Sequence, residues 1–131
     1  MKTVTTWKKK HEFESKQDHH AILIDGSRQN AISPKALLLS GLAGCSGIDV
    51  VDILTKMRID FSELEIDVET TQTEENPKIF RDIDITYKIK TDKLNENKVK
   101  KAIELSLDKY CGVSAMLKKN SSINYTLVVI D

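Results

Sequence analysis

The chain has 131 residues, of which 40% are hydrophobic and 31% are charged, and its formal net charge at neutral pH is zero. This length fits one ordinary domain over residues 1–131, which can bury a core without metal or disulfide support. Because 20 basic residues balance 20 acidic ones and aromatic residues make up only 5%, a dedicated nucleic-acid-binding role is excluded as the main reading. The composition also excludes disorder of the whole chain.

The sequence gives little indication of a segment that directs the chain to a membrane. Met1–Lys10 is polar and basic and lacks the apolar stretch of a secretory signal. The longest uncharged stretch, Ala36–Ile48, is shorter than the ~20 apolar residues that a membrane span needs, so we interpret it as part of the core. We therefore expect a cytoplasmic protein without a membrane partner.

The N-terminal part is predicted to form three short strands and then a long helix. The strands are expected over Thr3–Trp7, Glu12–Ser15 and His20–Ile24, with Asp25-Gly26 as a turn. Ser33-Pro34 is a strong helix start, because a serine oxygen can cap the first turn and proline needs no N–H partner there. This helix should continue to Met57 or Arg58.

The two halves of this helix differ in composition. The first half is apolar around its whole circumference and should be buried on every side. The residues that make it so are Ala36, Leu37, Leu38, Leu39, Leu42 and Ala43. Gly41, Gly44 and Gly47 weaken a helix, so we expect another backbone or a ligand to approach closely there.

The second part of the chain alternates between strands and helices. Leu64–Thr70 and Ile83–Ile89 show the period-two alternation of half-buried strands, which predicts a long antiparallel hairpin with one wet face. Helical spacing follows a plausible N-cap at Asn95, a short helix should run from Gly112 to near Lys119, and a last strand begins at Ile123. The order of elements predicts an α+β domain.

The two cysteines are the residues with the most chemical potential. Cys45 lies in the middle of the long helix, where no helix dipole lowers a thiol pKa, so a reactive Cys45 needs a cation from elsewhere. Cys111 stands between two helices, where helix-terminal N–H groups could approach its sulfur. The residues alone favour neither sulfur, and two small buried hydrophobic side chains remain the alternative.

The remaining candidate groups do not form a recognisable site. His19 and His20 are adjacent, so on a strand they point to opposite faces, and with His11 we interpret them as surface residues rather than metal ligands. The sequence contains no phosphate-binding glycine loop and no nucleophile elbow. Neither a metal nor another cofactor is expected.

The surroundings of both cysteines resemble the OsmC/Ohr family, named after osmotically inducible protein C and the organic hydroperoxide resistance protein. The likeness is carried by SPKALLLSGLAGCSGIDVV around Cys45 and LDKYCGVSAML around Cys111. Trp7, the Ser-Pro helix start and the acidic hairpin also fall in family order. Ile48-Asp49-Val50 and Lys56-Met57-Arg58 are similar to an OsmC-like branch of the family.

The resemblance implies an OsmC-like fold, in which an antiparallel sheet packs on a long central helix, and an intertwined homodimer with its long helices back to back. It also implies a stress-response peroxidase without metal or nucleotide. In such enzymes the first cysteine, here Cys45, reduces an organic hydroperoxide and becomes a sulfenic acid. The second, here Cys111, resolves it as a disulfide, and an external thiol or dithiol recycles the enzyme.

Two positions depart from the family pattern. The family's activating glutamate would fall at Lys35 or Ala36, and its arginine from the N-terminal strands is replaced by Lys8–Lys10 and His11, with Arg28 in a loop. Lysine supplies charge but not the planar fork of arginine. The alternative hypothesis is therefore a non-catalytic OsmC-like dimer that binds an apolar ligand or acts as a redox-sensitive interaction module.

Overall fold

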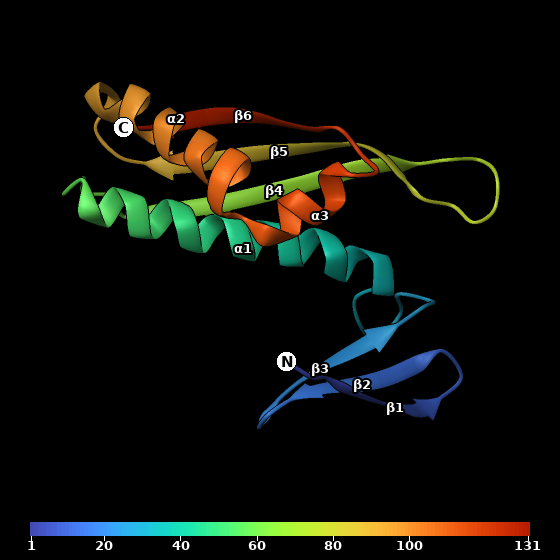
Figure 1. Cartoon of the computed structure of the whole chain (residues 1–131). Coiled ribbons are helices and arrows are strands. Elements are labelled where there is room, and N and C mark those ends of the chain that lie inside the picture. The colour runs from blue at the N-terminus through green and yellow to red at the C-terminus, as the bar shows by residue number, and fades with distance from the viewer. The chain divides into compact units, whose positions relative to one another are not determined.

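Figure 1 shows the computed structural model of the whole chain, which describes residues 1–131. The chain divides into two compact units, Met1–Leu39 and Ser40–Asp131, and helix α1 begins in the first and ends in the second. The elements in order are β1 (Val4–Lys9), β2 (Glu12–Gln17), β3 (His20–Asp25), α1 (Pro34–Lys56), β4 (Glu63–Gln72), β5 (Phe80–Lys90), η1 (Lys93–Asn95), α2 (Glu96–Leu105), η2 (Ser106–Tyr110), α3 (Gly112–Lys118) and β6 (Ile123–Ile130). The predicted order of strands and helices is confirmed.

The first unit contains an antiparallel sheet in the order β1-β2-β3. The tight turns between its strands require a left-handed backbone conformation, which residues with side chains rarely adopt. Lys10 and Asp18 adopt it, with φ values of 46° and 55°. Trp7 lies opposite Phe13, and Phe13 lies opposite Ile24, so these three side chains share one face of the sheet. The three predicted strands are confirmed, and each ends one or two residues later than predicted.

The turn after β3 is organised by a buried carboxylate. Asp25 is only 1% exposed and accepts hydrogen bonds from Ser27 N at 2.8 Å, Ser27 Oγ at 2.7 Å and Asn30 N at 3.0 Å. The hydrogen bonds from Ser27, side chain first, hold the pKa of Asp25 below its usual value, against the opposing effect of burial. The predicted Asp25-Gly26 turn is therefore an Asx-type turn with the carboxylate inside.

Helix α1 begins at Pro34, as predicted, but only one stripe of it is fully buried. That stripe consists of Leu42, Ser46, Val50 and Leu54, spaced four residues apart. Leu38 is 51% exposed, so the prediction that the first half is buried on every side is wrong for the single chain. Judged from the sequence, the apolar stretch is too short for a membrane span, but the whole of α1 is long and apolar enough to cross a membrane. Core helices of globular proteins often meet the same criteria of length and composition.

The glycines of α1 differ in their surroundings. A Cβ added to Gly47 would lie 3.0 Å from Ile66 Cδ1 on β4, whereas one added to Gly41 or Gly44 would meet nothing within 4 Å. At Gly47 the close neighbour is a side chain, so within the single chain the predicted approach of a backbone or a ligand is not found. Gly41 and Gly44 leave open space beside the helix.

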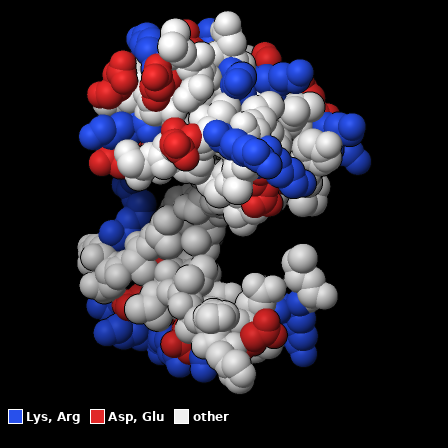
Figure 2. Space-filling model, turned by 90° about the vertical axis from the view of Figure 1, so that its left-hand side faces the viewer, with Lys and Arg blue, Asp and Glu red and all other residues white.

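The second unit contains the sheet β4-β5-β6, with β5 in the centre. Leu64 lies opposite Ile89 and Ile66 opposite Tyr87 in the β4–β5 hairpin. Alternate residues of β5 are buried, namely Ile83, Ile85, Tyr87 and Ile89. On the other face Lys88 Nζ contacts Asp67 at 2.8 Å, and Figure 2 shows both signs of charge interspersed on the surface. The hairpin with one wet face is confirmed.

The last strand corrects one detail of the predicted fold. β6 pairs with β5 in parallel, so the sheet is mixed rather than antiparallel. The reason is the connection: η1, α2, η2 and α3 carry the chain back to the start of β5, as parallel strands require. The α+β class, with a sheet and a long helix, is confirmed.

The start of α2 also differs in one detail. Asn95 occupies the predicted N-cap position but makes no capping hydrogen bond, and its Nδ2 donates to Thr91 Oγ1 at 3.1 Å. Asp92 caps the preceding turn instead, because its Oδ1 accepts from Leu94 N at 2.9 Å.

Candidate active site

The structure brings the two cysteines together within the unit Ser40–Asp131. Cys45 lies in the middle of α1, and Cys111 lies between η2 and α3. Both are free thiols, and the Cys45 side chain lies close enough to Cys111 to raise the pKa of the Cys111 thiol. Two sulfurs 66 positions apart in sequence are therefore neighbours in the fold.

The position of Cys111 is fixed by a turn of π-helix and by the start of α3. Cys111 N donates to Ser106 O at 2.8 Å, which closes the wide turn of η2. Ser114 N then donates to Cys111 Sγ at 3.4 Å, and Ser114 Oγ lies 3.0 Å from Cys111 O. The sequence prediction that helix-terminal N–H groups reach this sulfur is confirmed.

The environment of Cys111 keeps its thiol protonated. Its side chain is buried, at 3% exposure. Burial raises the pKa of the Cys111 thiol and outweighs the hydrogen bond from Ser114, which lowers it, while the neighbouring Cys45 raises it further. Local electrostatics therefore do not make Cys111 the more nucleophilic sulfur, although a helix-terminal N–H group reaches it. Cys45 is the more accessible of the two, at intermediate exposure.

A chain of buried hydroxyl groups lies behind the cysteine pair. Ser46 Oγ lies 2.6 Å from Tyr87 Oη and 2.9 Å from Ser106 Oγ, and Ser106 Oγ donates to Asp49 Oδ2 at 2.9 Å. Burial raises the pKa of Tyr87 to about 12, so its hydroxyl stays protonated. We call Tyr87, Ser46, Ser106 and Asp49 the hydroxyl network.

Sequence reasoning missed this network. Ser46 and Ser106 are completely buried. Two serines on the apolar faces of separate helices are a usable signal, because a buried hydroxyl requires a partner. The partner's identity depends on contacts between distant parts of the chain.

A pocket of about 370 Å³ opens one helical turn beyond Cys45. Its lining mixes charged and apolar side chains: Asp49, Asp52, Ile53, Lys56, Met57, Leu105 and Tyr110. A second, shallower groove of about 570 Å³ runs along the other side of α1, lined in part by Gly44, Ile48 and Ile66.

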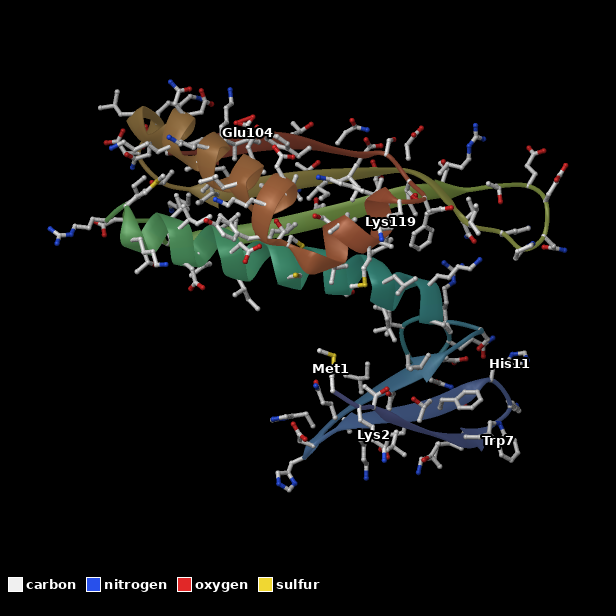
Figure 3. The ribbon with its side chains drawn as sticks, viewed as in Figure 1. Met1, Lys2, Trp7, His11, Glu104 and Lys119 are labelled. Atoms are coloured by element: carbon white, nitrogen blue, oxygen red, sulfur yellow. The ribbon has the colours of Figure 1, made fainter.

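The cations expected to activate Cys45 belong to the other unit. Lys8 Nζ lies 3.9 Å from Glu14 Oε1. Trp7 Nε1 donates to Lys10 O at 2.9 Å in the turn between β1 and β2. Figure 3 labels Trp7 and His11 in this hairpin. Arg28 has a φ of 61° in the turn after β3. The role of each as a thiolate partner stays a prediction.

Comparison with known proteins decides the family. A family model described as OsmC-like protein matches residues 25–126. The chain belongs to the OsmC-like family. Protein YhfA from Escherichia coli (strain K12) is 38% identical over 112 residues, which cover 85% of this chain and 84% of YhfA. The resemblance carried by the two cysteine segments is confirmed.

Solved structures show that this OsmC-like protein has the family fold. The OsmC-like protein from Mycoplasma pneumoniae superposes with a TM-score of 0.87 at 18% identity, over 99% of this chain and 96% of that one. The organic hydroperoxide resistance protein OhrB of Bacillus subtilis gives a TM-score of 0.66 at 17% identity, over 96% of both chains. At these identities the likeness concerns the fold alone.

Proposed function

We propose that this OsmC-like protein is a cysteine-based peroxidase that reduces organic hydroperoxides, with Cys45 attacking and Cys111 resolving. The observation that carries the proposal is the proximity of an accessible thiol and a buried one, close enough for Cys45 to raise the pKa of Cys111. The fold shared with the organic hydroperoxide resistance protein OhrB supports the substrate class.

The chemistry needs only the two sulfurs, a proton source and an external reductant. The Cys45 thiolate attacks one peroxide oxygen, the S–O bond forms as the O–O bond breaks, and the alkoxide takes up a proton and leaves as an alcohol. Cys111 then attacks the sulfenic sulfur, and the hydroxide leaves with the thiol proton as water. An external thiol or dithiol reduces the Cys45–Cys111 disulfide by exchange.

The surroundings of the two cysteines support this order. The first nucleophile must meet substrate as a thiolate, and the raised pKa and 3% exposure of Cys111 disfavour it for that step. A resolving thiol must instead lie beside the sulfenic sulfur and be shielded from peroxide, and Cys111 meets both conditions.

Single serine variants test this mechanism with tert-butyl hydroperoxide as substrate. Cys45→Ser should abolish peroxide consumption. Cys111→Ser should react once and then accumulate sulfenic or sulfinic acid at Cys45, detected by a sulfenic-acid trapping reagent and mass spectrometry. Full activity in Cys45→Ser, or no trapping at Cys45, refutes the peroxidase.

We also infer an intertwined homodimer, because apolar surfaces of both units are exposed in the single chain. Trp7 is 61%, Ile22 50% and Ile48 66% exposed. Trp7 and Ile22 lie on the same face of the first sheet, and Ile48 lines the shallow groove beside Gly44. A second copy of this chain offers matching apolar surfaces, so we propose it as the occupant.

The second candidate function requires the same groove to stay open. If Cys45 does not react with peroxide and the second copy packs elsewhere, the groove favours a non-catalytic OsmC-like dimer that binds an apolar ligand or acts as a redox-sensitive interaction module. Binding of a fluorescent fatty acid to the Cys45→Ser protein separates this candidate from the peroxidase, because only the binding module requires an apolar ligand to bind.

A further inference from the structure

The hydroxyl network connects the two segments that carry the cysteines. Ser46 directly follows Cys45 on α1, and the Ser106 carbonyl accepts the hydrogen bond of Cys111 N at 2.8 Å. The two serine hydroxyls lie 2.9 Å apart, across 60 positions of sequence. Each serine is thus tied to one cysteine, and their hydrogen bond joins α1 to η2.

The charge of Asp49 gives the network one direction. A hydroxyl group can donate one proton, and an ionised carboxylate only accepts hydrogen bonds. The Ser106 hydroxyl therefore donates to Asp49 Oδ2, at an oxygen–oxygen distance of 2.9 Å. Ser46 must then donate to Ser106, and Tyr87 to Ser46. Charge-assisted hydrogen bonds are the stronger ones, so this arrangement is favoured over its reverse.

The network has no unsatisfied member. Ser46, Ser106 and Tyr87 have zero exposure, and no buried side-chain oxygen or nitrogen in the protein lacks a partner. Without an acceptor at Asp49, the Ser106 hydroxyl could turn toward Ser46 O, which lies 3.5 Å away. The two possible donor–acceptor directions of the hydroxyl network would then be comparable in free energy. The joint between the two cysteine-bearing segments would then have more than one arrangement.

We propose that Asp49 is a positioning residue of the cysteine pair: through the hydroxyls of Ser106 and Ser46 it holds the Cys111 turn on α1, so that the two sulfurs close into a disulfide. The inference deepens the proposed function. It requires only that Cys45 and Cys111 bond to each other, whichever oxidant drives the reaction.

The test measures disulfide formation without peroxide. In mixtures of reduced and oxidised glutathione, the two thiols and one oxidised glutathione give the Cys45–Cys111 disulfide and two reduced glutathiones. Asp49→Asn keeps the shape but removes the charge, and should lower the equilibrium constant about tenfold. The matched control is Asp52→Asn, which removes the same charge from the next turn of α1 and should stay within about twofold of the wild type.

A double-mutant cycle distinguishes positioning from general destabilisation. Ser106→Ala should lower the equilibrium constant by itself, and Asp49→Asn added to it should change it by less than about twofold, because Asp49 acts through Ser106. Additive effects, or an Asp49→Asn protein that matches the wild type, would overturn the proposal. If Ser106→Ala fails to fold, the comparison of Asp49→Asn with Asp52→Asn decides alone.

The result is separable from that of the peroxidase test. A wild-type protein that forms the disulfide in glutathione but never traps sulfenic acid at Cys45 refutes the peroxidase and leaves the role of Asp49 standing. A wild-type protein that forms no Cys45–Cys111 disulfide in glutathione overturns the role of Asp49.

Discussion

The hydroxyl oxygens of Ser46 and Tyr87 lie 2.6 Å apart, and this contact joins the long helix to the central strand of the sheet. Both side chains are completely buried. A hydrogen bond in such a place costs free energy when it is broken, because the remaining hydroxyl cannot turn to water. The contact therefore stabilises the packing of α1 on β5.

Tyr87→Phe should lower the free energy of unfolding by about 1–2 kcal/mol, because it leaves the Ser46 oxygen with one partner fewer inside the core. Urea denaturation measures the change. The control is Tyr125→Phe, since Tyr125 Oη donates to the exposed Glu104, labelled in Figure 3, at 3.3 Å. Its effect should stay below about 0.5 kcal/mol. Equal losses of unfolding free energy in the two variants would show that the effect of Tyr87→Phe does not come from the hydroxyl network.

Gly44→Leu should prevent assembly or cause aggregation if two copies pack along α1. Within one chain a Cβ at Gly44 meets nothing within 4 Å, so a side chain at this position begins in open space. The wild type should sediment at twice the chain mass of 14.8 kDa, and Lys56→Leu on the polar side of α1 should do the same. A wild-type protein at the mass of one chain, or a well-behaved Gly44→Leu dimer, would contradict this contact.

One lysine of the N-terminal strands should activate Cys45. A thiol in the middle of a helix gains nothing from the helix dipole and requires a cation. Among Lys8→Gln, Lys9→Gln and Lys10→Gln, we expect one variant to form sulfenic acid at Cys45 about tenfold more slowly. Lys2→Gln serves as the control. An unchanged rate in the triple variant would exclude these lysines.

The fold was predictable where its signals are local. Alternation along β4 and β5 identifies the hairpin, and Ser33-Pro34 identifies the start of α1. The direction of β6 was not, because it depends on the path of the crossover rather than on the strand's own residues. Exposure at Leu38 was also missed, since an apolar helix does not reveal which of its sides the chain itself covers.

The candidate site was predictable only in part. Cys45 and Cys111 were found through their sequence surroundings, but their contact lies across 66 positions, and no local pattern indicates it. The raised pKa of Cys111 could not be predicted from its place between helices, because it depends on burial, which outweighs the hydrogen bond from Ser114. Ser46 and Ser106 resemble ordinary helix residues until they meet.

Acid should release the turn after β3. The pKa of Asp25 is lowered, first by the Ser27 side chain, so its carboxylate stabilises the fold above its ordinary pKa, and this contribution disappears as the pH falls through the lower folded value. Amide hydrogen exchange at Ser27 and Asn30 should accelerate below about pH 4, after correction for intrinsic rates. In Asp25→Asn these amides should already exchange fast at neutral pH. Protection that persists in the variant would contradict the turn's dependence on the charge.

Resolution by Cys111 should become faster with rising pH and show no plateau in the neutral range. The thiolate is the attacking form, and burial, the largest influence, raises the folded pKa of this thiol above its ordinary value of 9.0. Below that value the thiolate fraction grows about tenfold per pH unit, and so should the rate at which a preformed Cys45 sulfenic acid closes to the disulfide. One equivalent of tert-butyl hydroperoxide followed by rapid quenching and mass spectrometry measures this rate between pH 6 and 9. By the same sign, the protonated thiol contributes stability that is present below its ordinary pKa and lost as the pH rises through the raised folded value. Reduced wild-type protein should therefore lose more stability above pH 9 than Cys111→Ser does. A closure rate that levels off below pH 8 would show that the folded pKa is not raised, and the first attack would then have to be reassigned between the two sulfurs.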